Sequence, residues 1–359
     1  MKNFKTEFPA LDSFTYLNTA SCGLLSNRLV EWRAAHDKKL LDGGSVFRDL
    51  HRDHVARIRN TVSSFFDAQL KEIALIPNFS FGLNTLIEGL PQKRKVLLLK
   101  NDYPSINWPF ENRDFDVCYA NIDGHLEKNI EEAVAKYRPD VFAFSMVQYL
   151  SGIKIDLNFL KQLKAYHSDL ILIADGTQFL GTEAFSFSES PIDVMGASCY
   201  KWLLSGYGNG ILMVKEAIHT KLFPSTIGFN SAEAAYSKRD DVAFMRRFEP
   251  GHQDTLNYGS LEQSILFLKQ LGIETISEKI HSLAVYAREQ FSELGLIDDC
   301  IIERDNYSSI LTIQGDEALF QKLKKEQIIC SQRGKGIRVS YHFYNTQEDL
   351  EHLINVVKK

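Results

Sequence analysis

The sequence predicts an α/β fold: a large, mostly parallel sheet of seven strands covered by helices on both faces, followed by a smaller α+β domain. Between residues 73 and 215, short apolar runs recur with little alternation of polar and apolar positions, as expected for strands buried on both faces. Amphipathic segments separate most of these runs, and strand and helix taken in turn are typical of a doubly wound sheet. Beyond about residue 255 this alternation gives way to long helices with two isolated strands.

The predicted elements follow in chain order. The seven strands of the large sheet are 73–77, 95–100, 116–120, 141–147, 170–174, 194–199 and 211–214, with helices such as 126–137 and 156–167 between them. The later elements are a helix from about 260, a helix near 275–295, a strand at 308–315, a helix to 325, a strand at 336–343 and a helix from 346. We expect residues 1–25 to pack with the small domain, residues 26–250 to form the large domain and residues 251–359 to form the small one.

Composition narrows the class of protein. The chain has 359 residues, 44% of them hydrophobic, and a formal net charge of −5 without a basic block, which argues against nucleic acid or an anionic membrane as a partner. It begins without the pattern of a signal peptide and has no run long enough to span a bilayer, so we expect a cytoplasmic protein. Five scattered cysteines without a CxxC pair favour reduced thiols over disulfides, and they predict no metal site.

Two unusual residues follow neighbouring strands. Asp175 ends the apolar run "LILIAD", where a carboxylate can cap a helix, hold a magnesium ion or pair with a cationic ring nitrogen. Lys201 stands in "ASCYKWLLSGYGNG", between an apolar strand and a glycine-rich loop. That loop precedes a strand, whereas a dinucleotide-binding loop precedes a helix, so a nicotinamide site is disfavoured. Pyridoxal phosphate (PLP) needs this pair, a lysine for its Schiff base and a carboxylate for its pyridinium nitrogen.

A candidate phosphate cradle follows the first strand of the sheet. Asn78, Phe79 and Ser80 lead from that strand into a predicted helix, and helix N-termini offer free backbone N–H groups to anions. Ser80 is equally able to cap the helix without any ligand.

Taken together, these segments resemble the class V aminotransferase family of fold-type I PLP enzymes, which also contains cysteine desulfurases, selenocysteine lyases, kynureninase and isopenicillin N epimerase-like proteins. The resemblance covers nearly the whole chain. The matching segments are "YLNTASCG" (16–23), "NFSFGLNTL" (78–86), "NDYPSINWPF" (101–110), "SMVQYLSGIKIDL" (145–157), "ADGTQFLG" (174–181), "ASCYKWLLSGYGNGILMV" (197–214), "RRFEPG" (246–251) and "GIRVSYHFYNTQEDL" (336–350). The resemblance implies a homodimer whose sites are built across the subunit interface.

The resemblance also implies roles for single residues. Lys201 and Asp175 are the catalytic residues, Lys201 through the Schiff base and Asp175 through the pyridine nitrogen. Arg338 binds the substrate α-carboxylate, a task that suits its planar donors, although a surface salt bridge is the alternative. The remaining candidates for cofactor contacts are Phe79, Ser80 and Ser198 at the phosphate, Gln178 at the ring oxygen, Tyr103 stacked on the ring, and Gln148, Tyr149, Tyr200 and His252. Ala20 and Ser21 are candidates for the substrate pocket.

The sequence departs from the family at four places. Tyr200 stands where the family commonly has a histidine before the lysine, and Gln148-Tyr149 replaces an asparagine segment, as in kynureninase and the epimerase-like branch. His252 replaces a threonine that in many relatives reaches the neighbouring subunit's phosphate. Desulfurases carry a nucleophilic cysteine on a loop before the carboxylate-binding arginine; here the short "CSQRGKGIR" leaves Cys330 at a strand end, where we expect a structural thiol.

These observations predict a PLP-dependent enzyme that acts on an amino acid or a related amine. We slightly favour an aminotransferase over a cysteine, selenocysteine or kynurenine lyase, with an epimerase as a further alternative. The missing cysteine loop weakens only the desulfurase interpretation, and lyases that release sulfur without a cysteine nucleophile stay open. A catalytically silent PLP-binding regulator is the alternative of another class. The presence of Lys201, Asp175, Gln178 and Arg338 together argues against that alternative.

Overall fold

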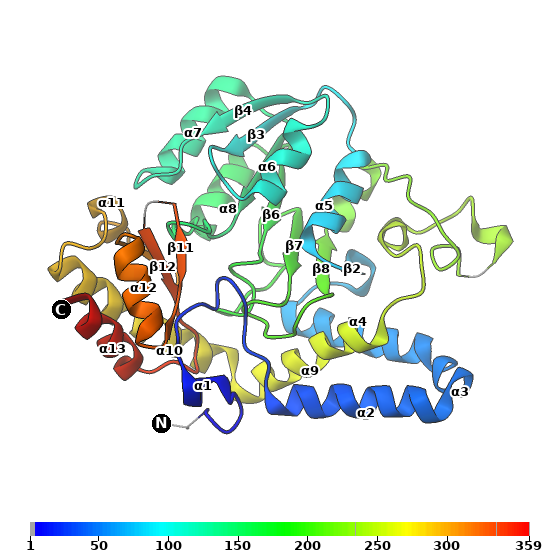
Figure 1. The fold of residues 1–359 in the computed structure, drawn as a ribbon. Helices are drawn as coiled ribbons and strands as arrows, with labels where there is room; N and C mark the ends of the chain where they lie inside the picture. The colour runs from blue at the N-terminus through cyan, green and yellow to red at the C-terminus, as the bar shows by residue number, and fades with distance from the viewer. Residues whose placement is uncertain (1–3, 234, 335, 359) are drawn as a thin grey trace.

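A computed structural model describes residues 4–233, 235–334 and 336–358, and it confirms the predicted fold class (Figure 1). The large sheet has the strand order β2-β8-β7-β6-β5-β3-β4. Strands β3 to β7 are parallel, whereas β8 runs antiparallel to both of its neighbours. The strands are β2 (Ile73–Ile76), β3 (Lys95–Leu99), β4 (Asp116–Ala120), β5 (Val141–Ser145), β6 (Ile171–Asp175), β7 (Val194–Ser198) and β8 (Gly210–Val214).

The strands of the sheet centre are buried on both faces, which explains their unbroken apolar sequences. Every residue of β5 and β6 is buried. In β5, Phe142 and Phe144 belong to one apolar core, while Val141 and Ala143 belong to the core on the opposite face. Because successive side chains of a strand point to opposite faces, both positions must be apolar when helices cover both sides.

Helices cover the sheet and extend from it (Figure 1). The longer helices before the small-domain sheet are α2 (Asn27–Gly43), α4 (His51–Phe66), α5 (Phe79–Glu88), α6 (Pro104–Glu111), α7 (Leu126–Tyr137), α8 (Leu157–Tyr166) and α9 (Thr255–Leu271). Helix α9 lies in the range predicted for the small domain and contacts α2 and α4. The helix predicted from about residue 260 begins earlier, because the Asp254 carboxylate accepts hydrogen bonds from the backbone N–H groups of Leu256 and Asn257 and caps α9 at Thr255. Shorter elements are α1 (Ala10–Ser13), α3 (Ser45–Arg48), α11 (Asp299–Ile302), η1 (Leu70–Glu72), η2 (Glu216–Lys221), η3 (Tyr236–Lys238) and η4 (Phe244–Phe248).

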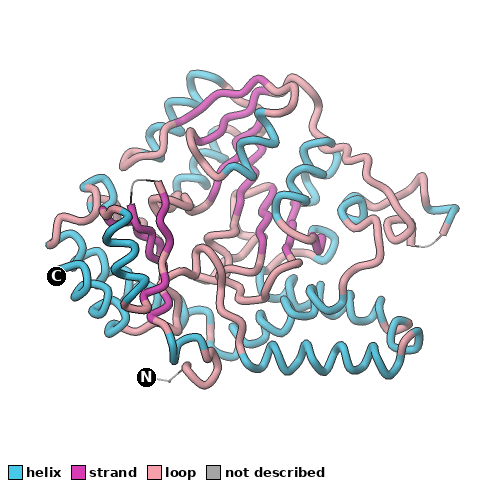
Figure 2. The backbone as a smooth tube through the Cα atoms, viewed as in Figure 1, coloured by secondary structure: helices cyan, strands magenta, loops and turns pink. Residues whose placement is uncertain are grey.

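The small domain has a separate sheet and a separate core. In Figure 2 its strands form a group apart from the large sheet. Its elements are α10 (Ile273–Glu293), β9 (Ile310–Gln314), α12 (Glu317–Lys325), β10 (Ile328–Ile329), β11 (Ser331–Arg333), β12 (Gly336–Ser340) and α13 (Gln347–Lys358). Strands β11, β12 and β9 form an antiparallel sheet in that order.

The N-terminal segment lies on the small domain although it precedes the large one in sequence. β1 (Thr15–Tyr16) pairs in parallel with β10, and Asn18 forms a bridge with Ser340 at the end of β12. Leu17 lies in the core of the small domain. The exact residues at which the domains divide stay a prediction. No described helix is both long and apolar enough to cross a bilayer.

Candidate active site

Lys201 lies in the turn between β7 and the antiparallel β8. Gly206 and Gly208 of this turn have φ values of 73° and 87°, in the left-handed region that glycine adopts without strain. The Lys201 side chain points into the protein and is 6% exposed. Its Nζ lies 5.7 Å from the ring centroids of both Tyr103 and Tyr200, and it has no hydrogen bond or ion pair with a described residue. A lysine so placed is not snorkelling to solvent.

Burial and the neighbouring positive charges lower the pKa of Lys201. Burial lowers the pKa of Lys201 to about 8, and the positive charges of Arg338 and Arg333 act in the same direction, against the opposing effect of Asp175. A lysine with a lowered pKa carries a larger fraction of free amine near neutral pH, which is the nucleophilic form.

Asp175 ends β6 and is fixed by its own turn. The carboxylate is buried and accepts a hydrogen bond of 2.8 Å from the backbone N–H of Thr177. Burial raises the pKa of Asp175, while the hydrogen bonds from Thr177 and the charge of Lys201 act against that rise. The Thr177 hydroxyl also accepts a hydrogen bond of 3.0 Å from the backbone N–H of Ser198, so one side chain joins the ends of β6 and β7.

A small cavity brings five of the predicted residues together. It is lined by Tyr103, Ser145, Val147, Tyr149, Asp175, Thr177, Gln178 and Lys201. Its outer wall contains the half-buried Tyr103 and Tyr149, whose rings meet edge to face at 5.2 Å. Stacking of an aromatic ligand on Tyr103 would replace this contact between the two tyrosines.

Gln178 is held from both sides. Its Nε2 donates to the carbonyl oxygen of Ala20 at 3.0 Å, and its Oε1 accepts a hydrogen bond of 2.7 Å from the indole N–H of Trp202. The N-terminal segment therefore reaches the cavity through Ala20. Ser21 follows in the same segment and is half-buried.

The start of α5 is held against the ends of β7 and β8. The backbone N–H of Phe79 donates to Ser198 Oγ at 3.0 Å, and Asn78 Oδ1 caps the helix by accepting from Phe81 N–H at 2.9 Å. A Cβ at Gly210 would lie 2.7 Å from the carbonyl oxygen of Ala197 and 3.2 Å from Cα of Asn78, so this close approach requires glycine. The helix dipole at this terminus suits a phosphate.

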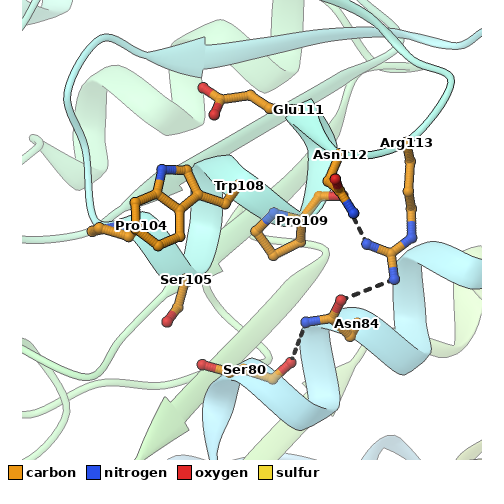
Figure 3. Close-up of a pocket in the computed structure, with 9 residues that line it drawn as sticks. All are labelled: Ser80, Asn84, Pro104, Ser105, Trp108, Pro109, Glu111, Asn112 and Arg113. Atoms are coloured by element: carbon orange, nitrogen blue, oxygen red, sulfur yellow. Dashed lines mark hydrogen bonds between the residues drawn. The ribbon is translucent and has the colours of Figure 1, made fainter.

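Ser80 lies on the edge of a different hollow, which Figure 3 shows between α5 and α6. This groove of about 580 Å³ is lined by Ser80, Asn84, Pro104, Ser105, Trp108, Pro109, Glu111, Asn112 and Arg113. Asn84 donates to the carbonyl oxygen of Ser80 and accepts from Arg113, at 2.8 and 2.9 Å. Ser80 is therefore not among the residues that line the cavity at Lys201.

Arg338 approaches the cavity from the small domain. It lies on β12, is 3% exposed, and donates through Nη1 to the carbonyl oxygen of Tyr149 at 2.8 Å. Its Nε is buried without a hydrogen-bond partner, and within the described part of the chain no carboxylate pairs with it. Burial and the charge of Arg333 lower the pKa of Arg338 to about 10. A buried guanidinium with an unused donor is an incomplete site for a carboxylate.

Three other predicted residues have different surroundings. The Gln148 side-chain oxygen accepts from the backbone N–H groups of Leu150 and Ser151, at 2.7 and 2.6 Å, and so stabilises its own turn. Tyr200 stacks on Tyr207 with ring centroids 4.5 Å apart.

His252 is exposed, lies outside the cavity, and places Nε2 3.2 Å from a guanidinium nitrogen of Arg48. Its predicted contact with a neighbouring subunit's phosphate stays a prediction.

Sequence reasoning missed a buried carboxylate beside the cavity. Asp102 accepts from the backbone N–H of Tyr103 at 2.7 Å and of Ser145 at 2.8 Å, and so fixes the position of Tyr103 relative to β5. Burial raises the pKa of Asp102 to about 6. The signal was its place directly after an apolar strand. Thr177, Trp202 and Arg333 were missed as well.

Cys330 has a buried thiol, as expected for a structural cysteine. It lies between β10 and β11, is 8% exposed, and burial raises its pKa to about 11. Strands β11 and β12 pair Arg333 with Gly336, so only two residues of sequence connect them. A connection this short is not long enough to form a loop that carries a cysteine.

The donor groups around the cavity fit PLP. They comprise a buried lysine amine, a buried carboxylate and a half-buried aromatic wall. The N-terminus of α5 is joined to the strand that precedes Lys201 by the hydrogen bond between Phe79 and Ser198. Metal-ligating clusters do not occur among the described residues.

Comparison with known proteins gives one consistent result. The family model described as Aminotransferase class-V matches residues 43–353. The uncharacterized aminotransferase YcbU of Bacillus subtilis is 23% identical over 99% of this chain and 97% of its own length. The isopenicillin N epimerase of Amycolatopsis lactamdurans is 22% identical over 96% of this chain and 94% of its own length. Among solved structures, the apo cysteine desulfurase of Thermococcus onnurineus NA1 superposes with a TM-score of 0.87 at 17% identity, over 100% of this chain and 98% of that one.

Proposed function

The chain belongs to the class V aminotransferase family and is a PLP-dependent enzyme, and on that premise we propose that it transfers the amino group of an amino acid to a keto acid. The observation that carries the proposal is the buried Arg338 guanidinium, which has an unused donor and whose charge acts on Lys201. An α-amino acid presents a carboxylate and an amine in one rigid unit. Arg338 would hold the first while the second approaches the position of Lys201.

The residues divide the chemistry among themselves. Bound PLP supplies a sink for the electron pair left on the substrate Cα when a proton is removed. The Lys201 amine would accept and return that proton, and its lowered pKa of about 8 leaves about a tenth of it unprotonated at pH 7. Asp175 would hold the proton of the pyridine nitrogen. Tyr103 and Tyr149 form the wall that excludes water from the reacting atoms.

Transfer is favoured over sulfur release because no cysteine stands in the two-residue connection that precedes β12 and its Arg338. Cys330 is buried and its thiol has a raised pKa, whereas a thiolate nucleophile must be exposed. A carbon–sulfur lyase that uses no such cysteine is the second candidate, supported by curated relatives named probable cysteine desulfurase, such as that of Ureaplasma parvum at 23% identity.

Stoichiometry distinguishes the two candidates. The PLP-loaded protein is incubated with single amino acids while keto acid, ammonia and sulfide are measured. An aminotransferase releases at most one equivalent of keto acid per site until a keto acid acceptor is added, and then continues. Continued release of ammonia or sulfide from one substrate alone would show a lyase, and a racemised product without either would show an epimerase.

We also propose a cytoplasmic homodimer. The loop after β8 exposes Phe223, Ile227 and Phe229 by half or more of their surface, and Phe229 lies beside His252, with ring centroids 6.1 Å apart. A second subunit covering this apolar loop would place His252 in the interface. None of the five cysteines forms a disulfide, which suits a reducing compartment. Light scattering at full PLP occupancy tests the dimer, and a monomer would contradict it.

A further inference from the structure

A second arginine stands beside Arg338 on the small-domain sheet. In the antiparallel pair β11–β12, Ser331 lies opposite Arg338 and Arg333 lies opposite Gly336. Residues directly opposite one another share a face of the sheet, and so do residues two apart along a strand. Arg333 and Arg338 therefore project from the same face.

This face is the one turned toward the active site. Three of its side chains bond to the segments around the cavity. Ser331 Oγ donates to Asn18 Oδ1 at 2.8 Å, Arg338 donates to the carbonyl oxygen of Tyr149 at 2.8 Å, and Thr312, opposite Arg338 on β9, donates to that of Leu150 at 2.5 Å. Arg333 extends this face at its solvent-exposed edge.

The charge of Arg333 is unbalanced. Its side chain has no hydrogen bond or ion pair with any residue in the described ranges, yet its charge contributes to the lowered pKa values of both Lys201 and Arg338. Three cations thus share one region with two buried carboxylates, Asp175 and Asp102, and burial raises the pKa of both carboxylates. Such an arrangement favours an anionic ligand with more than one negative group.

We propose that Arg333 binds the second carboxylate of a dicarboxylic amino acid, of the aspartate or glutamate type, whose α-carboxylate is held by Arg338. The inference rests on the proposed function, since it names the substrate class of the same site. Arg338 is buried and suits the α-carboxylate common to all amino acids, whereas Arg333 lies at the open edge, where the distal end of a side chain extends. Arg333 is then the residue that sets specificity.

The binding test needs no turnover. Calorimetry measures the affinity of the PLP-loaded enzyme for glutarate, which has two carboxylates, and for butyrate, which has one. We expect glutarate to bind at least about 10-fold more tightly, the order expected for a charge-assisted pair. Arg333→Gln should remove this preference and leave butyrate unchanged, and Arg333→Lys should keep part of it. Arg94→Gln is the matched control, because Arg94 immediately precedes β3, whereas the active site gathers at the carboxyl ends of these strands.

The kinetic test compares glutamate with glutamine and aspartate with asparagine. Arg333→Gln should lower kcat/KM for the acidic member of each pair by about 10-fold or more and leave the amide member within twofold. Equal affinity for glutarate and butyrate, or equal losses for both members, would overturn the assignment of Arg333 while leaving the proposed function intact. A glutarate preference that depends on Arg333, in a protein that reacts with no amino acid, would instead overturn the proposed function and support the dicarboxylate site.

Discussion

The amine of Lys201 should titrate far below an ordinary lysine, and two neighbours should move it in opposite directions. A pKa of about 8 in place of 10.5 gives about 300-fold more free amine at pH 7, equivalent to about 3 kcal/mol. Arg338→Gln removes a cation that opposes the charged lysine, so the pKa of Lys201 should rise. Asp175→Asn removes the carboxylate that favours the charged lysine, so its pKa should fall.

Trace labelling measures this titration directly. The protein freed of PLP is acetylated with a small amount of acetic anhydride across a pH series, and mass spectrometry follows the peptide that contains Lys201. Lys128, with a side chain 72% exposed, is an internal reference in the same sample. If Lys201 titrated together with Lys128, or if both variants shifted it the same way, the account of the site as a buried and charge-tuned amine would be wrong.

Four further outcomes are expected. Arg338→Gln should lower kcat/KM by about 10- to 100-fold through loss of the charge-assisted bonds to the α-carboxylate, and an unchanged KM would contradict that role. Cys330→Ala should leave any sulfide release from cysteine within twofold, and its loss in an assay of sulfide would make Cys330 the nucleophile. His342 is fully buried and its pKa is lowered to about 4, so between pH 6.5 and 4 the unfolded chain binds a proton at this residue and the folded chain does not. Urea unfolding should therefore show that the free energy of unfolding falls by about 3 kcal/mol over this pH range. His342→Gln should make the free energy of unfolding less dependent on pH. Gly23→Ala would place a Cβ 2.0 Å from the carbonyl oxygen of Lys201, so melting temperature and PLP affinity should both fall, whereas Gly251→Ala, with no atom within 4 Å, should change neither.

The strands of the large sheet were predictable because burial on both faces requires short, unbroken apolar runs in the sequence. Strands β2, β3, β4, β5 and β7 begin at the predicted residues, β6 and β8 begin within one residue of them, and all seven strands end within two residues of the predicted runs. The start of α9 was predicted too late, since a short polar segment capped by Asp254 carries no apolar periodicity.

The proximity of Asp175 and Lys201 was also predictable, because residues at the carboxyl ends of adjacent parallel strands lie close together. The ends of β6 and β7 bring Asp175 and Lys201 to one cavity, as that rule requires.

Other parts of the site depend on contacts that no local pattern encodes. Gln178 is held by Ala20 and Trp202, which are far from each other in sequence. Arg333 is placed on the same face as Arg338 by the register between β11 and β12, which the sequence does not reveal. Gln148 stabilises its own turn through a hydrogen bond from the backbone N–H of Ser151. Local patterns report which residues are polar and where strands end, whereas the partner of each side chain follows from tertiary packing.

The pairing of β1 with β10 has a consequence for the order in which the molecule is made. The strands of the large sheet all lie between residues 73 and 214 and can assemble once that stretch has been synthesised. Thr15 must wait for Ile328, and the backbone N–H of Ala20 must wait for the Ser340 hydroxyl. At about 5–20 residues per second, that interval is about 15–60 s on the ribosome. A nascent chain can therefore carry Lys201 on a folded sheet well before the Ser340 hydroxyl fixes Ala20, and tight cofactor binding should follow only after residue 340 has been synthesised.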